Sequence, residues 1–269
     1  MTGSKWGDLS AEFLGTMVLI LFGCGVVAQV VTGGDAQVGG DHDSIAWAWG
    51  FGVTFGIYIS ARLSGAHLNP AVTLALAVFR GFEWRRVAPY CLAQLLGAFV
   101  AAIIVRFVYA DQIANVDPSH TGDTQGIFST SPGPGVSILT AFADQVVGTA
   151  ILVAVILALT TATNNPPMAN IGPLFVGFLV VAIGMAWGTN AGYAINPARD
   201  LGPRLASLMT GYGNALNVAG GDTLYFWLPI VAPLVGGLVG GAVFKYLIEI
   251  HLPSDPEDVT VAEPVGRTP

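Results

Sequence analysis

Two short segments of the chain pair an Asn with a following Pro in apolar surroundings. Residues 65–71 read GAHLNPA, and residues 192–198 read GYAINPA, followed directly by RD. Asn is a strong N-cap and Pro is favoured at the first helical position, so Asn69 and Asn196 each predict the start of a helix. The Asn oxygen can accept from free backbone N–H groups, which leaves the side-chain NH₂ available as a donor. The sequence therefore predicts two hydrogen-bond donors held at helix starts.

The helices that follow these Asn residues are too short to cross a membrane. Residues 70–81 and 197–211 predict helices of about 11–13 residues, or about 18 Å at ~1.5 Å per residue, against a hydrocarbon core of about 30 Å. Each segment therefore predicts a re-entrant half-helix. The stretches before them, 65–68 and 192–195, are expected to run extended along a cavity, because non-helical backbone at membrane depth must line water or be buried in protein.

The composition indicates that much of the chain is surrounded by lipid. Of its 269 residues, 53% are hydrophobic and only 10% are charged, whereas a soluble domain carries about 25% charged residues. The net charge of −7 and the absence of a basic cluster argue against a nucleic-acid partner. Cys24 and Cys91 lie in apolar runs, where a role as small buried hydrophobes is simpler than a disulfide or a metal pair. No metal site and no cofactor are predicted.

Six stretches are apolar and long enough to span a bilayer, which needs roughly 20 such residues. They are residues 9–31, 44–61, 87–109, 137–161, 170–188 and 223–247.

The charges in the connections predict the orientation of these spans. The connection between the second and third spans is rich in Arg, whereas the connections on either side of it carry Asp and no Lys or Arg. The positive-inside rule therefore places that connection and both termini in the cytoplasm. The sequence predicts a multi-pass protein of the plasma membrane, with residues 253–269 as a disordered cytoplasmic tail.

The chain also carries an internal repeat. AEFLGT at 11–16 matches DQVVGT at 144–149, and AQLLGA at 93–98 matches APLVGG at 232–237, in the same order as the two Asn-Pro-Ala segments. Each half holds three spans and one such segment. Because three is odd, the second half enters the membrane upside down, which makes the repeat inverted.

We therefore expect one channel domain over residues 1–252, built from inverted repeats at about 8–110 and 138–248. Inverted symmetry would bring the two half-helix starts together near the midplane. Asn69 and Asn196 would then face one spot, together with two positive helix ends.

This arrangement predicts a narrow path for a small neutral molecule. Backbone carbonyls would supply acceptors along one wall, from Gly65, Ala66, His67, Leu68, Gly192, Tyr193 and Ala194. The two Asn donors would stand in the middle, and apolar side chains would lie opposite. The positive helix ends disfavour cations, and a central water that accepts from both Asn residues cannot easily relay a proton.

At these residues the chain resembles the aquaporin, or major intrinsic protein, family, and within it the glycerol facilitators, or aquaglyceroporins. SGAHLNPAV at 64–72 and GYAINPARDLGPR at 192–204 are similar to the family's two signature loops, and the similarity runs from residue 11 to about 251. The resemblance implies an all-α membrane fold of six helices plus two half-helices, a pore in each subunit and a homotetramer in the lipid bilayer. It implies a passive channel for glycerol and similar small neutral polyols, with some water, that excludes protons and ions, and no enzyme.

The resemblance also assigns an outer constriction by position, to Trp49, Gly184, Tyr193 and Arg199. Trp49 and Tyr193 would form an apolar corner for a carbon chain, and Gly184 would leave room. Arg199 would donate to a passing hydroxyl or water and repel cations. Tyr193 departs from the Phe that is usual in the bacterial facilitators, and it adds a hydroxyl.

The family usually places a Glu in the first helix of each repeat, where it accepts from the backbone of the half-helix loops. Glu12 fits this pattern, but its counterpart is the uncharged Gln145, so we expect the second loop to be held less firmly. Asp200 is expected to help seat the half-helix loop. Arg62 would either narrow the inner mouth or extend to the membrane interface, and the second is favoured. His42 falls in a predicted connection and is given no role.

Three other functions share some of these sequence features. A secondary transporter also uses inverted repeats and broken helices, with Glu12 and Asp144 as the only candidates for ion coupling, but paired half-helices favour a rigid pore. A membrane-embedded enzyme would need a nucleophile and base or metal ligands at membrane depth, and the sequence has no His/Cys/Asp cluster. Within the channel class, a water-selective pore is the nearest alternative.

Overall fold

The computed structural model describes residues 5–34 and 40–254, and this part of the chain contains helices and no β-strand. Within these residues, six helices are long and apolar enough to cross a membrane. They are α1 (Lys5–Thr32), α2 (His42–Ser64), α4 (Trp84–Val108), α7 (Ile138–Thr160), α8 (Gly172–Ala191) and α10 (Leu228–Leu247). The predicted six spans and all-α membrane fold are confirmed. The predicted tail, 253–269, lies outside the described residues from position 255 onward.

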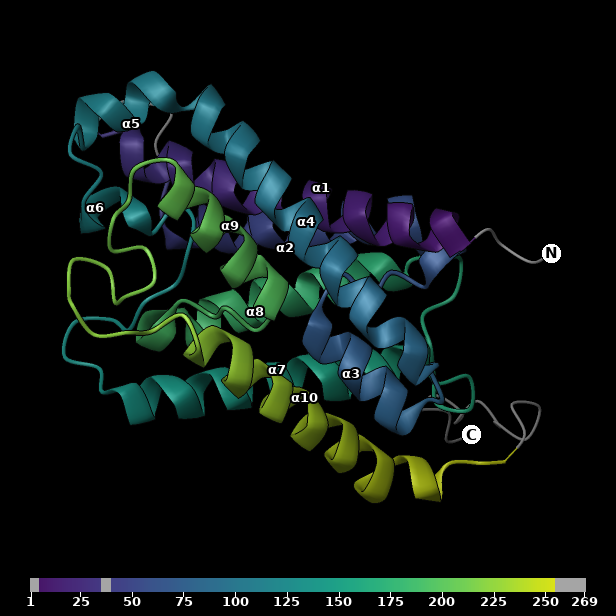
Figure 1. Cartoon of the computed structure of the whole chain (residues 1–269). Coiled ribbons are helices and arrows are strands. Elements are labelled where there is room, and N and C mark those ends of the chain that lie inside the picture. Colours follow the sequence, from purple (N-terminus) through teal and green to yellow (C-terminus); the bar gives the residue numbers. More distant parts are fainter. Residues whose placement is uncertain (1–4, 35–39, 255–269) are drawn as a thin grey trace, which may run out of the picture.

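Two short helices begin at the Asn-Pro-Ala segments. They are α3 (Pro70–Phe79), with 10 residues, and α9 (Pro197–Met209), with 13 residues. Both have an Asn as N-cap and a Pro in the first turn. Figure 1 shows them running from the middle of the molecule toward opposite ends. The predicted half-helices are therefore present; α3 is slightly shorter than the expected 11–13 residues, and α9 falls within that range.

The connection between the halves holds two short helices that were not predicted from the sequence. They are α5 (Ala110–Val116) and α6 (Gly122–Gln125), which lie at the end of the molecule opposite the start of α1 (Figure 1). A short 3₁₀ helix, η1 (Glu249–His251), follows α10. The sequence predicts that the last span begins at residue 223, but 221–227 are not helical and α10 starts only at Leu228, next to a Pro in its first turn.

Glycines let the helices of each half cross closely. A Cβ on Gly97 of α4 would lie 2.2 Å from the carbonyl oxygen of Phe13 in α1. A Cβ on Gly236 of α10 would lie 2.4 Å from the carbonyl oxygen of Val146 in α7. Small residues allow such backbone approach between membrane helices. The two crossings use the segments that match in sequence, which supports the repeat.

The two halves also meet each other at a pair of glycines. Gly50 of α2 and Gly177 of α8 face one another, and a Cβ on either would lie 2.6 Å from the carbonyl oxygen of the other. The helices α2 and α8 hold the same place in their respective halves. This reciprocal contact is the one expected where a two-fold axis passes between them.

Candidate functional site

The two loops that precede the half-helices share an unusual backbone. Three matching positions in each have positive φ, namely Gly65 (85°), Ala66 (53°) and Leu68 (52°), and Gly192 (69°), Tyr193 (36°) and Ile195 (44°). The expectation of extended backbone is therefore wrong. Each loop must turn from the end of a long helix into a half-helix start within four residues, and left-handed positions achieve this. A non-Gly residue there costs about 1–3 kcal/mol and persists only where its surroundings enforce it.

The side-chain amides of the two Asn residues cross between the loops. Asn69 Nδ2 donates to the carbonyl of Ile195 at 2.8 Å, and Asn196 Nδ2 donates to the carbonyl of Leu68 at 2.8 Å. Each bond joins one half of the chain to the other. An amide NH₂ carries two hydrogens, so each Asn keeps one further donor. The free donors could be predicted from the sequence, but the crossed bonds could not.

The oxygens of the same amides cap the half-helices. Asn69 Oδ1 accepts from Ala71 N at 2.8 Å. Asn196 Oδ1 accepts from Ala198 N at 3.0 Å and from Arg199 N at 3.2 Å. In each Asn, the oxygen accepts from backbone N–H groups and one N–H donates to a backbone carbonyl. The orientation of the remaining N–H is therefore fixed.

Glu12 holds the first loop from α1. Its side chain is fully buried. One carboxylate oxygen accepts from His67 N at 2.9 Å, and the other accepts from Leu68 N at 2.8 Å and from the Gln94 amide at 2.7 Å. The role that the resemblance implied for Glu12 is thus matched by its two bonds from the loop backbone.

Gln145 stands at the equivalent place for the second loop but bonds differently. Its Oε1 accepts from Ile195 N at 2.9 Å, and its Nε2 donates to the carbonyl of Ala191 at 3.0 Å. Beside it, Asp144 accepts from the Asn190 amide at 3.0 Å. Gln145 therefore accepts one loop N–H where Glu12 accepts two, and it adds a donor bond that a carboxylate cannot make.

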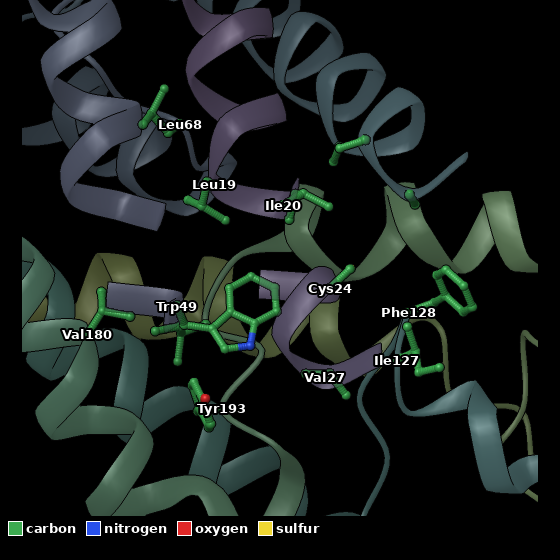
Figure 2. Packing of buried hydrophobic residues seen from close by; sticks show 14 of the residues in the cluster. Leu19, Ile20, Cys24, Val27, Trp49, Leu68, Ile127, Phe128, Val180 and Tyr193 are labelled. Carbon is green, nitrogen blue, oxygen red and sulfur yellow. The ribbon is translucent and has the colours of Figure 1, made fainter. Parts of the chain in front are cut away.

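Three of the four residues of the expected constriction come together around one opening. The Arg199 guanidinium lies 3.9 Å from the centre of a Trp49 ring, within cation–π range. Figure 2 shows Trp49 and Tyr193 approaching each other from α2 and from the loop before α9. Gly184 lies behind Tyr193, since a Cβ there would be 3.0 Å from Tyr193 Cζ. Gly184 thus leaves room for the Tyr193 ring itself.

Two polar atoms at this constriction are buried without a partner. Within the described residues, neither Trp49 Nε1 nor the Tyr193 hydroxyl has a hydrogen bond. Such a buried group costs about 1–3 kcal/mol, and most buried polar groups in proteins are paired. Both residues line a cavity, but the two atoms themselves are inaccessible and lie within its wall.

The cavity has a volume of about 470 Å³ and reaches from this constriction past both Asn residues. Most of its wall is apolar. Its lining comprises Leu19, Trp49, Val53, Ile57, Ala61, Gly65, Ala66, His67, Leu68, Asn69, Val72, Leu76, Leu152, Ile156, Leu159, Thr160, Gly172, Pro173, Val176, Val180, Tyr193, Ala194, Ile195, Asn196 and Arg199. Of the residues predicted to form the path, Gly184 and Gly192 lie behind this wall.

Asp200 contacts the connection between α6 and α7 rather than the loop that precedes its own helix. It accepts from the backbone and hydroxyl of Thr130 at 2.8 and 2.7 Å and pairs with Arg204 at 2.7 Å. Arg204 is fully buried and also donates to the carbonyl of Ala215 at 2.7 Å. Thr130 packs against Gly192, where a Cβ would lie 3.1 Å from the Thr130 methyl carbon. Asp200 therefore supports the second loop through Thr130.

His42 and Arg62 lie at opposite ends of α2. Arg62 is exposed and does not line the cavity, which fits a side chain that extends to the interface. His42, given no role from sequence, contacts the constriction: its Nε2 lies 2.8 Å from the Gly184 carbonyl oxygen. The available signal was spacing, because His42 precedes Trp49 by two helical turns and so shares its face.

Comparison with known proteins agrees with this geometry. The family model described as Major intrinsic protein matches residues 2–244, and the chain belongs to this family. It is 42% identical over 262 residues to a glycerol uptake facilitator protein of Escherichia coli and 44% identical over 261 residues to that of Pseudomonas aeruginosa, covering 94% of this chain and 92% of each relative. An X-ray structure of the aquaglyceroporin from Plasmodium falciparum superposes with a TM-score of 0.82 at 35% identity, covering 92% of this chain and 98% of that one.

Proposed function

We propose that this chain is a passive membrane channel that conducts glycerol and similar small neutral polyols, with some water, and excludes protons and ions. The strongest support is the cavity, which runs along the two Asn residues whose amides bond across the halves and ends at the Arg199–Trp49 pair. Relatives that are 42–44% identical over almost the whole chain are named glycerol uptake facilitators, which supports the substrate.

The selectivity filter in this proposal is the constriction of Trp49, Gly184, Tyr193 and Arg199. Arg199 donates to a hydroxyl or water and repels cations, while the Trp49 and Tyr193 rings accept a carbon chain. Gly184 gives the Tyr193 ring its space. The partly apolar wall suits a molecule that has both carbon and hydroxyl edges.

The middle of the path is formed by the two Asn donors and the loop carbonyls. Gly65, Ala66, His67, Leu68, Tyr193 and Ala194 line the cavity and offer acceptors, whereas Gly192 contributes as the cap of α8. Asn69 and Asn196 each offer one N–H. A water that accepts from both cannot also accept a proton from its neighbour, so proton relay is interrupted.

The other functions are less well supported. The chain belongs to a family of channels, so it is a channel protein and not an enzyme. A transporter would need its halves to rock, but the crossed amide bonds join the halves at the centre. Glu12 and Asp144, the candidates for ion coupling, are engaged by Gln94 and Asn190.

We further propose that the protein lies in the plasma membrane, that both of its termini are in the cytoplasm, and that four copies assemble into a tetramer. The exposed Arg85, with 77% of its side chain accessible, lies at the start of α4, which supports a cytoplasmic position for this end. The tetramer rests on the family resemblance. The channel domain is proposed to span 1–252, with repeats at about 8–110 and 138–248.

Stopped-flow light scattering on proteoliposomes tests the channel function. In a glycerol gradient, vesicles that contain the protein should shrink and then re-swell quickly, and collapse of proton and sodium gradients should leave the rate unchanged. Empty vesicles are the control. Rapid shrinkage in sucrose without re-swelling in glycerol would replace the proposal with a water-selective channel.

A further inference from the structure

Gly23 lies where the Trp49 ring of the proposed filter packs against α1, and it is not itself a member of that filter. It is a buried residue of α1, next to Cys24. A Cβ on Gly23 would lie 2.2 Å from Cζ3 of Trp49 and 2.3 Å from its Cε3 and Cη2. These nearly equal distances place the added atom over the face of the six-membered ring rather than at its edge. The indole therefore lies flat against the α1 backbone, beside Cys24 (Figure 2).

The opposite face of the same indole carries Arg199. The guanidinium carbon lies 3.9 Å from the centre of a Trp49 ring. The backbone of α1 already covers one face of the ring at Gly23, and two groups cannot stack there at contact distance, so the guanidinium lies on the other face. Both Trp49 and Arg199 line the cavity. The distance of the ring from α1 is therefore set by Gly23.

The inverted repeat has the same two positions in its second half, with different side-chain sizes. Gly23 and Ile156 each lie 12 residues after the first residue of the matching segments AEFLGT and DQVVGT. Trp49 and Val176 each lie 20 residues before the Asn of their own half. Ile156 and Val176 both line the cavity. The first half thus combines the largest side chain with none, where the second half has two of medium size, which supports a pair matched in volume.

Resting on the proposed channel function, we propose that Gly23 is a positioning residue that sets the width of the outer constriction, because it lets the Trp49 ring lie back against α1. Carbon atoms in contact stand about 3.5–4.0 Å apart, so a methyl group at position 23 would displace the ring from α1 by on the order of 1 Å. The ring is the end of a side chain and can move, and it would move toward Arg199 and the path. Pore diameter decides which solutes pass, so glycerol would be hindered more than water.

Shrinking and re-swelling rates of proteoliposomes in gradients of sucrose, urea and glycerol test this inference. Gly23→Ala should lower the ratio of glycerol to water permeability on the order of tenfold, the consequence of one crowded contact at the narrowest part of the path. The ratio of urea to water permeability should fall less, because urea is smaller than glycerol. A general loosening of α1 would instead change the three permeabilities together.

Gly25→Ala is the matched control on the same helix. A Cβ on Gly25 would have no other helix within 4 Å in the part of the chain that the structure describes, and its φ is not positive. The same methyl group is therefore added two residues away without touching Trp49. The permeability ratios of Gly25→Ala should equal those of the wild type.

A second pair of variants tests whether the effect passes through the Trp49 ring. Trp49→Leu removes the ring, so adding Gly23→Ala to it should change the glycerol-to-water ratio by less than about twofold, the usual limit for residues that do not interact. If Gly23→Ala alone does not fold, the double variant decides, since Trp49→Leu should then restore a folded protein.

Three results would overturn the inference. They are an unchanged glycerol-to-water ratio in Gly23→Ala, an equal loss of water, urea and glycerol flux in that variant, and a Gly23→Ala effect of the same size with and without the Trp49 ring. Failure of the channel function itself would be seen separately, since the wild type would then not re-swell in glycerol.

Discussion

The two half-helix loops have nearly the same backbone but are held in different ways. Loop 65–68 is anchored by a buried carboxylate, that of Glu12, which accepts three N–H groups. Loop 192–195 is anchored by a neutral amide, that of Gln145, and by contact with Thr130. Thr130 is in turn fixed by the Asp200–Arg204 pair. The same loop conformation can therefore be stabilised either by one nearby charge or by a wider network of hydrogen bonds and an ion pair.

Breaking the wider network should have the largest effect. Asp200→Ala leaves Arg204 buried without its partner, and loss of one member of a buried pair costs about 3–5 kcal/mol. The melting temperature of the detergent-solubilised protein should fall steeply, and glycerol flux should fall with it because the second loop loses Thr130. Asp222→Ala, at an exposed position, is the control. Equal melting temperatures for the two variants would show that the network does not support the second loop.

Making the first loop resemble the second should have the next largest effect. Glu12→Gln retains one acceptor, but its NH₂ then faces N–H groups of the loop and of Gln94. We expect a loss of about 1.5–3 kcal/mol, the range for hydrogen bonds to charged groups, seen as a lower melting temperature and slower water and glycerol flux. Glu83→Gln, the same change at an exposed site, should have little effect. Unaltered stability of Glu12→Gln would mean that charge is not what holds this loop.

The converse change sharpens the comparison. Gln145→Glu gives the second loop the family's usual residue, but the new carboxylate faces the Ala191 carbonyl and lies beside Asp144. Instead of a gain, we expect a loss of about 1–2 kcal/mol at neutral pH, because a donor bond is replaced by two opposed acceptors. Protonation at low pH restores a donor, so the deficit relative to wild type should shrink on acidification. A melting temperature above wild type at pH 7 would contradict this.

The smallest expected effect on stability is at Asp117, between α5 and α6. Burial alone would raise the pKa of Asp117, but hydrogen bonds from the Thr121 backbone and the Thr124 hydroxyl outweigh it and lower the pKa below its usual range. A lowered folded-state pKa means that the stabilisation is complete above the unfolded-state pKa and is lost as the pH falls through the folded-state pKa. Asp117→Asn should therefore destabilise the protein at pH 7 and less at strongly acid pH. A difference in melting temperature that is independent of pH would refute this.

Much of the fold could be predicted from the sequence because lipid imposes simple rules. Six apolar runs gave six spans, and Asn followed by Pro gave the starts of α3 and α9 within one residue. The short α5 and α6 were missed because seven and four residues are too few to show an apolar periodicity.

Functional residues could be predicted only where the residue type and its immediate neighbours indicate the role. Asn69 and Asn196 could be identified as donors, but their acceptors lie 126 and 128 residues away, which no local pattern gives. The contact between Asp200 and Thr130 likewise spans 70 residues. His42 was missed because the predicted second span began after it, so its helical relation to Trp49 was not considered.

The crossed amide bonds have a consequence for how the chain is made. Asn69 leaves the ribosome 126 residues before its acceptor, the Ile195 carbonyl. At roughly 5–20 residues per second, that interval lasts about 6–25 s, during which the Asn69 amide lacks this acceptor. The first Asn-Pro-Ala segment is therefore made well before the bond that joins it to the second half can form. Its final seating is an event of late biosynthesis, completed only when the second half arrives.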